Sequence, residues 1–385
     1  MSEFRTIREL CSVVVDCPHS TPKWTANGKI VIRNKNIKHG KIDFSSPSYT
    51  DDEHFAQRIK RAKPQPGDII ITREAPIGDV GMIPENTECC LGQRMVLLRA
   101  NQSVCDNFYL LYSLQSLYVQ HQISWSEGTG TTVSNLRIPH LEQIQIPYLP
   151  LEQQAKISSV LRALEEKIEN NRRLNDNLQQ QAMSLYAEMF LNSSDSNVTS
   201  GTLSDIAVIT MGQSPSGSSY NEDGVGEVFY QGRAEFGFRF PKRRLFTTEP
   251  KRMAEAGDVL LSVRAPVGDL NIAYERCCIG RGLGAIHSKT DHSSFVLYTM
   301  FALRSQLDVF NGEGTVFGSI NRDALNAIPI DIPPVTEIDQ FEVVAHPIDE
   351  LIRANYEENC RLEAIRDSLL PKLMSGEIDV SAVQL

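Results

Sequence analysis

Apolar positions recur at alternating steps of four and three along two stretches of the chain, which predicts two long amphipathic helices. The first helix is expected within residues 151–192 and the second within 335–385. Two neighbouring positions on each apolar face are asparagine, namely Asn171 and Asn175 in the first and Asn355 and Asn359 in the second. Asparagine on such a face favours pairing with another asparagine, so we expect the helices to pack on each other with these four residues fixing the register. The remaining positions of the two faces are Ile157, Leu161, Leu164, Ile168, Leu178, Ala182, Leu185 and Met189, and Phe341, Ala345, Ile348, Ile352, Leu362, Arg366, Leu369 and Leu373.

The two helices are expected to run antiparallel. About 34 helical residues carry the first helix roughly 50 Å from its start, and the linker after it, residues 191–200, can span at most about 35 Å. The second domain must therefore begin near the far end of the first helix, and the second helix returns from there. In this register Asn171 faces Asn359 and Asn175 faces Asn355. The alternative is that each helix packs separately on its own domain.

The helices belong to an internal duplication, because residues 128–190 realign on residues 312–374 without a gap. A second repeat, GDIIITREAPIGD at 67–79, reappears as GDVLLSVRAPVGD at 257–269, and each copy indicates a turn, a buried strand and a Pro-x-Gly turn. Single helices are expected over 106–124 and 292–310. The expected fold is α/β (α+β), with a pseudo-two-fold internal repeat of two similar globular domains, 1–150 and 193–334, separated by two long antiparallel coiled-coil helices, 151–192 and 335–385.

Composition limits the class of protein. The chain has 385 residues and a formal net charge of -10, but most of the excess acid lies in 335–385, so the charge does not exclude a DNA partner. No apolar run approaches membrane-spanning length and no secretory leader is recognisable, so we expect a cytoplasmic protein. The pairs Cys89-Cys90 and Cys277-Cys278 lack zinc-site spacing and are expected to be buried thiols.

The sequence lacks the usual signatures of catalysis. No phosphate-binding loop, dinucleotide-binding glycine motif, His-Glu-x-x-His metal motif or nuclease-like carboxylate pair is found, so the chain is expected to do no chemistry alone and to bind no metal. The glycine-rich stretches at 128–132 and 312–315 contain Thr131 and Thr315, whose hydroxyls could hold a DNA phosphate. The alternative is that both stretches are plain glycine turns.

The repeated 67–79 segment, the helix start from Gln154 to Ile157 and the closing LLPKLMSGEI at 369–378 resemble the specificity subunit of type I restriction-modification systems. The resemblance covers the whole chain, although the second helix start, EIDQ at 337–340, is displaced from the usual pattern. It implies two target-recognition domains that each read one half of a bipartite double-stranded DNA site, with the helices setting the spacer and seating two methyltransferase subunits. Those partners would bring S-adenosylmethionine to methylate adenine N6, and restriction/translocase subunits would use ATP and Mg; this chain would bind no cofactor.

Arginine, lysine, asparagine and glutamine are the side chains that most often read base edges or hold phosphates. For any one candidate, the alternative is a solvated surface group. Two other classes also stay open: a self-sufficient DNA methyltransferase or nuclease, and a protein-binding scaffold with a helical stalk. The candidates are Arg33, Lys35, Asn36, Lys38, Arg73, Gln93, Arg94 and Asn135 in the first domain, and Gln213, Ser214, Arg233, Lys242, Arg243, Arg264 and Arg281 in the second.

Overall fold

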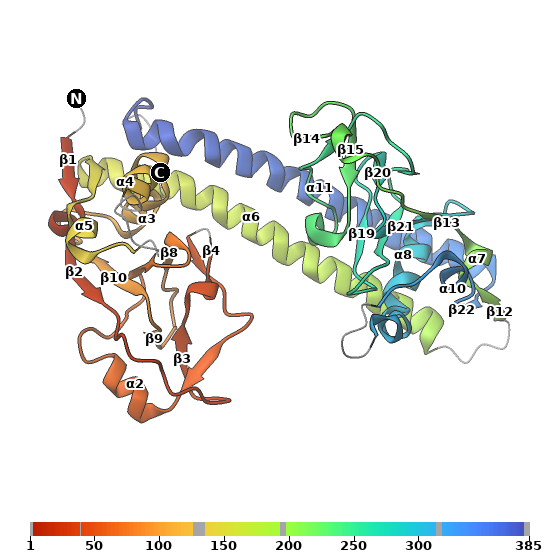
Figure 1. Ribbon diagram of the computed structural model, residues 1–385, viewed down its shortest axis with the longest axis horizontal. Helices are drawn as coiled ribbons and strands as arrows, with labels where there is room; N and C mark the ends of the chain where they lie inside the picture. The colour runs from red at the N-terminus through yellow and green to blue at the C-terminus, as the bar shows by residue number, and fades with distance from the viewer. Residues whose placement is uncertain (1–2, 39, 126–134, 193–197, 313–317, 381–385) are drawn as a thin grey trace. The chain divides into compact units, whose positions relative to one another are not determined.

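The computed structural model describes residues 3–38, 40–125, 135–192, 198–312 and 318–380. The chain divides into two compact units, unit 1 (Met1–Asn170 and Glu358–Leu385) and unit 2 (Asn171–Glu357). Two long helices, α6 (Leu151–Tyr186) and α11 (Val335–Ser375), each contribute one part to each unit (Figure 1). The four-part division expected from the sequence gave the helices segments of their own, whereas each compact unit includes half of both.

Unit 1 is a mixture of short strands and helices that leads into α6. Its strands are β1 (Glu3–Thr6), β2 (Cys11–Asp16), β3 (Lys29–Ile32), β4 (Ile37–Lys38), β5 (Lys41–Ile42), β6 (Ser48–Thr50), β7 (Ile69–Arg73), β8 (Ile77–Met82), β9 (Cys89–Leu91), β10 (Met95–Ala100) and β11 (Gln145–Tyr148). Its helices are α1 (Ile7–Leu10), the 3-10 turn η1 (Asn34–Asn36), α2 (Asp52–Arg58), α3 (Asn107–Gln115), α4 (Leu117–Trp125) and α5 (Ile138–Gln143).

Unit 2 repeats most of this order of elements. Its strands are β12 (Thr199–Thr202), β13 (Ala207–Met211), β14 (Tyr220–Asn221), β15 (Glu227–Tyr230), β16 (Phe246–Thr247), β17 (Met253–Ala254), β18 (Val259–Ser262), β19 (Leu270–Ile272), β20 (Cys277–Ile279), β21 (Leu283–Ser288) and β22 (Pro329–Ile332). Its helices are the π-turn η3 (Ala187–Leu191) that ends α6, α7 (Leu203–Ile206), η4 (Gly217–Ser219), η5 (Arg233–Glu235), α8 (Ser293–Ala302), α9 (Arg304–Asp308), η6 (Val309–Asn311) and α10 (Arg322–Asn326).

The central sheets of the two units have the same topology. The central sheet has the order β2-β10-β7-β8 in unit 1 and β13-β21-β18-β19 in unit 2, antiparallel throughout. A smaller sheet in each unit contains one parallel pair, β3 with β9 and β15 with β20. The predicted α/β (α+β) fold with an internal repeat is therefore confirmed, and the repeat extends through both globular parts.

Equivalent residues begin the central sheet in each unit. The backbone amide of Thr6 donates to the Glu9 carboxylate at 2.7 Å, and that of Thr202 donates to Asp205 at 2.7 Å. These reciprocal caps start the short helices α1 and α7, whose buried residues anchor the chain before it enters β2 or β13.

The paired cysteines lie in the cores of the smaller sheets. Cys89, Cys90, Cys277 and Cys278 are fully buried and free, as the sequence predicts. Burial raises the pKa of Cys89 and Cys277 to about 12, so these thiols stay protonated and serve as small apolar side chains.

Two helices stand where the sequence predicted one over 106–124, and the same is true over 292–310. Ser116 is extended, with φ -65 and ψ 146, and separates α3 from α4. In unit 2, Leu303 lies between α8 and α9. The break in unit 1 turns α4 so that Val119 and Ile123 enter the core, which apolar content alone could not indicate.

The start of each long helix is tied to the helix packed beside it. In unit 1, Oε1 of the buried Gln154 accepts a hydrogen bond from the backbone amide of Asp106. Its Nε2 donates to the backbone carbonyls of Val104 and Leu149. In unit 2, Glu342 accepts hydrogen bonds from the amides of Ser294 and Phe295, both at 3.0 Å, at the start of α8. Glu342 thus makes a comparable tie, although the second helix start departs from the pattern of the first.

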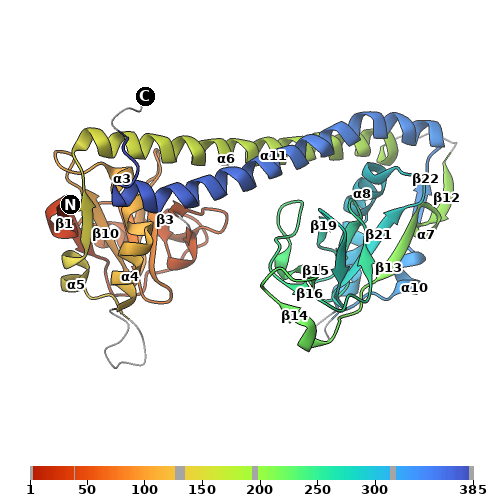
Figure 2. The same ribbon diagram turned by 90° about the horizontal axis from the view of Figure 1, so that it is seen from above.

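The two long helices pack against each other within each unit, which the apolar faces predict. In unit 1, Asn359 Nδ2 donates to the carbonyl of Ile168 at 3.4 Å, and Lys167 pairs with Glu358 at 3.1 Å. In unit 2, Asn355 Nδ2 donates to Asn175 Oδ1 at 2.8 Å. Figure 2 shows the last turns of α11 beside α3, where Ser113 contacts Met374.

The smaller sheet of unit 2 is braced against α11 by a buried polar network. Arg239 pairs with Asp349 at 3.1 Å, and the Tyr298 hydroxyl donates to the same carboxylate at 2.8 Å. In unit 1, the half-exposed pair Lys41–Glu169, at 3.1 Å, links the two-stranded sheet of β4 and β5 to α6. Each of these contacts joins the globular part of a unit to one of its long helices.

No helix within the described ranges is both long and apolar enough to cross a membrane.

Candidate nucleic-acid interface

A basic cleft opens in unit 1. It lies beside the ends of β3 and β9 and beside the turn that follows β7. It encloses about 260 Å³, and Arg33, Lys35 and Arg94 give it positive charge. The guanidinium of Arg33 lies 4.9 Å from the ring centre of Trp24, which is itself 45% exposed. Stacked aromatic and basic groups at an open cleft are typical of nucleic-acid contacts. The full lining is Pro22, Trp24, Arg33, Asn34, Lys35, Ala75, Gly92, Gln93 and Arg94.

Two residues that line this cleft have left-handed backbones without being glycine. Arg94 has φ 66 and Ala75 has φ 45. Such conformations are strained for residues with a side chain and concentrate at functional sites. The exposed Arg94 side chain is oriented by Glu74, whose Oε2 lies 3.2 Å from Arg94 Nε.

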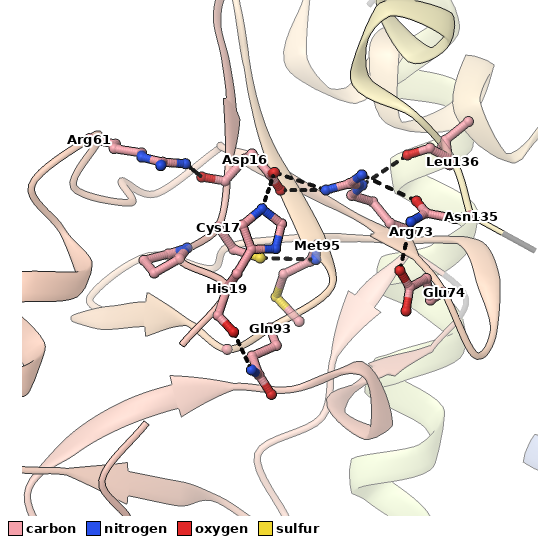
Figure 3. Close-up of polar contacts among 12 residues, drawn as sticks. Asp16, Cys17, His19, Arg61, Arg73, Glu74, Gln93, Met95, Asn135 and Leu136 are labelled. Carbon is pink, nitrogen blue, oxygen red and sulfur yellow. Dashed lines mark hydrogen bonds and ion pairs between the residues drawn. The ribbon is translucent and has the colours of Figure 1, made fainter. Parts of the chain in front are cut away.

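Arg73, a predicted base reader, is instead an internal tie (Figure 3). Its Nη1 lies 2.9 Å from both carboxylate oxygens of Asp16, Nε donates to the carbonyl of Leu136 at 2.8 Å, and Nη2 donates to Asn135 at 3.2 Å. Only 11% of the side chain is exposed. Asn135 in turn donates to Glu74 at 2.8 Å, so both side chains are committed to the protein.

Asn36, a second predicted base reader, is also structural. It is 4% exposed, its Oδ1 accepts from the amide of Arg33 at 3.0 Å, and its Nδ2 donates to the carbonyl of Asp43 at 2.9 Å. These bonds close the turn that presents Arg33 and Lys35 to solvent. The side-chain amide of Asn36 is thus bonded within the protein and buried.

The other predicted side chains of unit 1 lie at the surface. Lys35 is exposed at the cleft, and the half-buried Gln93 donates to the carbonyl of His19 from the cleft wall. Lys38 pairs with Asp43 at 3.0 Å. Hydrogen bonds from Ser45, aided by Lys38, lower the pKa of Asp43 to about 2, so this ion pair is present throughout the physiological range.

The matching backbone positions of unit 2 carry different side chains. The amide of Arg73 donates to the carbonyl of Arg94, and the amide of Val263 donates to that of Gly282, which makes Arg94 and Gly282 equivalent. A side chain on Gly282 would begin 2.9 Å from the carbonyl oxygen of Gln231, so unit 2 excludes one there. By the same alignment, Glu74 and Asn135 correspond to Arg264 and Ser319.

Several predicted residues of unit 2 gather at this position. Arg281 is exposed and its amide donates to the hydroxyl of Ser214 at 3.2 Å. Gln213 is exposed, and its amide donates to the carbonyl of Ile279 at 2.9 Å, beside the same loop. Within the part of the chain that the structure describes, no hydrogen bond or ion pair holds the side chains of Arg264, Arg281 or Gln213.

The remaining basic candidates of unit 2, Arg233, Lys242 and Arg243, lie on η5 and the segment that follows it. Arg233 is paired with Asp269, and Arg243 with Glu275 at 2.5 Å, whereas Lys242 is exposed. Both arginine side chains are about half exposed, so these ion pairs are open to water and to exchange with another anion. Unit 2 therefore offers free and exchangeable cations on one segment.

Two predicted phosphate contacts, Thr131 and Thr315, lie outside the described residues. Inside them, no group of three or more His, Cys, Asp or Glu side chains could hold a metal ion.

Two side chains that contact the basic groups of the cleft, Trp24 in its lining and Glu74 beside it, were not among the sequence candidates. Glu74 orients Arg94, and its signal was present in the repeat as a mismatch, Glu74 against Arg264, next to the mismatch of Arg73 against Val263. Trp24 is one of two tryptophans and stacks on Arg33, but nothing around it in the sequence indicates that it is exposed.

Comparison with known proteins gives matches along nearly the whole chain. The family model described as type I restriction modification DNA specificity domain matches residues 3–180 and again 195–359. A protein of Methanocaldococcus jannaschii named for the specificity subunit of the type I restriction enzyme MjaX is 29% identical, over 98% of this chain and 94% of its own. The type I restriction enzyme MjaIX specificity subunit of the same organism is 24% identical, over 82% and 78%. Among solved structures, the S subunit of the type I restriction-modification system from M. genitalium has a similar fold, with a TM-score of 0.60 at 19% identity over 97% of this chain and 96% of that one.

Proposed function

This chain belongs to the type I restriction modification DNA specificity family, and we propose that its two target recognition domains read the two halves of one bipartite DNA site. Specificity subunits of this family are non-catalytic, so recognition is the task left to the chain. One observation carries the proposal: one backbone framework presents Glu74 and Arg94 in unit 1 and Arg264 and Gly282 in unit 2. Because the two units present different side chains on the same backbone framework, they would read different half-sites.

The polar side chains at the surface beside this position are the proposed base readers, and all but the half-buried Gln93 are exposed. In unit 1 they are Arg33, Lys35, Gln93 and Arg94, and in unit 2 Gln213, Arg264 and Arg281. Arginine reads guanine and glutamine reads adenine through paired hydrogen bonds in the major groove. Asn36, Arg73 and Asn135 drop out because their polar groups are already bonded within the protein.

Phosphate contacts are proposed for the cations of the surrounding surface. Lys38, Arg233 and Arg243 sit in exposed ion pairs, which contribute little to stability, so exchanging a carboxylate for a DNA phosphate costs little. Lys242 is exposed on the same segment as Arg243. Ser214 is better suited to hold the Arg281 loop than to touch DNA, because its hydroxyl accepts the amide of Arg281.

The long helices are proposed to set the spacer between the half-sites and to seat the methyltransferase subunits. A continuous helix of 36 residues is about 54 Å long, which exceeds one duplex turn of roughly 34 Å. Val343, Val344 and Leu351 are exposed on α11, at 74%, 49% and 44%. Exposed apolar side chains on one helix suit a protein partner better than DNA.

The chemistry of the assembly is assigned to the partners. In this proposal the methyltransferase subunits supply S-adenosylmethionine and transfer its methyl group to adenine N6, and restriction/translocase subunits supply the ATP- and Mg-dependent steps. This chain decides where on the DNA those reactions occur.

Deletion and restoration of the chain in its host, followed by mapping of N6-methyladenine, tests the proposal. The expected result is a bipartite motif with two unlike halves that disappears on deletion and returns on restoration. Methylation that is unchanged by deletion would contradict it. Methyl transfer by the purified chain without partners would support the alternative of a self-sufficient enzyme.

A further inference from the structure

Arg94 combines three features that no other described residue shares. Its backbone has φ 66, its side chain is 58% exposed at the basic cleft of unit 1, and its guanidinium is held by a carboxylate from the neighbouring strand end. The other non-glycine residues with positive φ are Ala75, Asn86 and Asp291, none of which carries a long polar side chain. Unit 2 has glycine at the equivalent position.

A strained backbone under an exposed arginine needs a reason other than folding, because a glycine would adopt this backbone without strain. Packing does not supply the reason, since Arg94 is exposed and makes one ion pair. What the conformation achieves is the placement of a guanidinium at the mouth of a cleft of about 260 Å³.

The pairing with Glu74 fixes which part of the guanidinium is free. Glu74 Oε2 lies 3.2 Å from Nε of Arg94, and Glu74 Oε1 accepts a hydrogen bond from Asn135 at 2.8 Å. Asn135 is itself bonded to Arg73, which is anchored on Asp16. The Glu74 carboxylate is thus fixed by Asn135 on one oxygen and contacts Arg94 Nε with the other. The two terminal nitrogens of Arg94 remain available to donate a pair of hydrogen bonds to a ligand.

We propose that Arg94 is a specificity-determining residue that reads one guanine of the half-site of unit 1, with Glu74 as the residue that positions it. A planar fork of two donors matches the O6 and N7 acceptors of guanine in the major groove, whereas adenine presents a donor in place of O6. The inference rests on the proposed function and adds to it the identity of one base. In unit 2, with Gly282 and Arg264 at these positions, the same reading is absent.

The test uses the chain assembled with its methyltransferase subunits and maps N6-methyladenine in the host. Arg94→Gly should relax one guanine of one half-site, with discrimination there falling about 10- to 100-fold, while every other position of the motif is retained. Arg94→Lys should weaken discrimination at the same position less than Arg94→Gly does, because lysine can also donate to O6 and N7 but lacks the planar fork. A motif unchanged in Arg94→Gly would overturn the assignment.

Folding is controlled separately. Glycine accepts the backbone of residue 94, so Arg94→Gly should leave the thermal midpoint unchanged or raised. Asn86→Gly is the matched control, since Asn86 has φ 57 and is exposed in a turn outside the cleft. Asn86→Gly should likewise leave the thermal midpoint unchanged or raised, while leaving the motif intact.

The positioning role of Glu74 is tested by coupling. Glu74→Ala should weaken discrimination at the same guanine as Arg94→Gly, and the double variant should discriminate no worse than Arg94→Gly alone. A merely structural Glu74 would lower methylation at all positions equally, and additive losses in the double variant would reject the positioning role. If the unaltered chain directs no bipartite motif, the proposed function itself fails, before any variant is considered.

Discussion

Asn355 donates a hydrogen bond from Nδ2 to Oδ1 of Asn175 across the two long helices within unit 2, at 2.8 Å. Both side chains are buried, and Asn175 also donates to the carbonyl of Ile352 at 3.2 Å. A buried asparagine pair satisfies itself only in one register, because a shift along the helix would leave its polar groups against apolar neighbours. The pair therefore lowers stability relative to an apolar pair, but it fixes the register of the two helices.

Replacing one asparagine of this pair should cost more than replacing both. Asn175→Leu leaves the Asn355 amide buried without its partner, and we expect a loss of about 1–3 kcal/mol in the free energy of unfolding. The double variant Asn175→Leu/Asn355→Leu removes both polar groups and should be close to the stability of the unaltered chain or above it. Urea unfolding of the purified chain measures both effects.

Asn177→Leu is the control, because Asn177 lies on the exposed face of α6 two residues further on. It should change stability by less than about 0.5 kcal/mol. Losses that simply add in the double variant would show that the two asparagines act independently.

The long helices were predictable because the information that specifies them is local and periodic. The steps of four and three locate the buried positions of α6, starting at Ile157, and of α11, ending at Leu373. The repetition of the asparagines indicates that they pair. The break at Ser116 was not predictable, because every residue around it is compatible with helix and the turn of α4 depends on where the core lies. The tie made by Glu342 was missed for a similar reason: its partners are amides 47 and 48 residues away in sequence.

The ion pair between Arg73 and Asp16 has an apolar counterpart in unit 2. By strand register the equivalent positions are Val263 and Met211, which both lie within 3.5 Å of where a side chain on Gly284 would begin. Arg73→Val alone removes the arginine from a partly buried carboxylate, although the exposed His19 stays 2.9 Å from Asp16. We therefore expect a loss of about 3 kcal/mol, at the lower end for a buried pair because water reaches both groups and His19 remains. Asp16→Met/Arg73→Val, which copies unit 2, should recover the free energy of unfolding to within about 1 kcal/mol.

Arg8→Val is the comparison for this pair, since Arg8 and Glu142 form an exposed ion pair whose loss should cost under about 1 kcal/mol. Thermal unfolding of all four chains provides the measurement. A double variant less stable than Arg73→Val would mean that the bonds from Arg73 to Leu136 and Asn135 matter more than the ion pair.

The candidate interface was only partly predictable, because residue type indicates which side chains can bind DNA but not which are already bonded. In the sequence, Arg33, Arg73 and Arg94 all appear as arginines able to bind DNA. Asp16, which pairs with Arg73 inside the protein, lies 57 residues earlier on another strand, so the sequence does not indicate this ion pair. Asn36 resembles a base reader until the chain folds back to bring the Asp43 carbonyl to its amide. Only the folded arrangement separates these groups.

Acid should weaken unit 1 through Glu88. Hydrogen bonds from Lys29 and Lys63 lower the pKa of this carboxyl from 4.5 to about 2. A carboxyl with a depressed folded-state pKa contributes stability that is complete above its unfolded pKa and is lost as the pH falls toward the folded one. The thermal midpoint of the unaltered chain should therefore exceed that of Glu88→Gln at pH 6, and the difference should shrink from about pH 4.5 towards pH 2.

Glu85→Gln, in the turn just before Glu88, is the matched control and should leave the midpoint unchanged at pH 6. A difference between the unaltered chain and Glu88→Gln that grows as the pH falls would reverse the expected sign and reject the role of the lysine pairs.

The central claim, that each unit reads its own half of the DNA site, is tested most directly by exchanging one equivalent residue between the units. Gln93 and Arg281 follow equivalent glycines, Gly92 and Gly280, in the two copies. N6-methyladenine should be mapped in hosts that carry Gln93→Arg or Arg281→Gln in the assembled complex. We predict that Gln93→Arg alters only one half of the motif and Arg281→Gln only the other. Changes that fall in the same half, or in neither, would contradict the account.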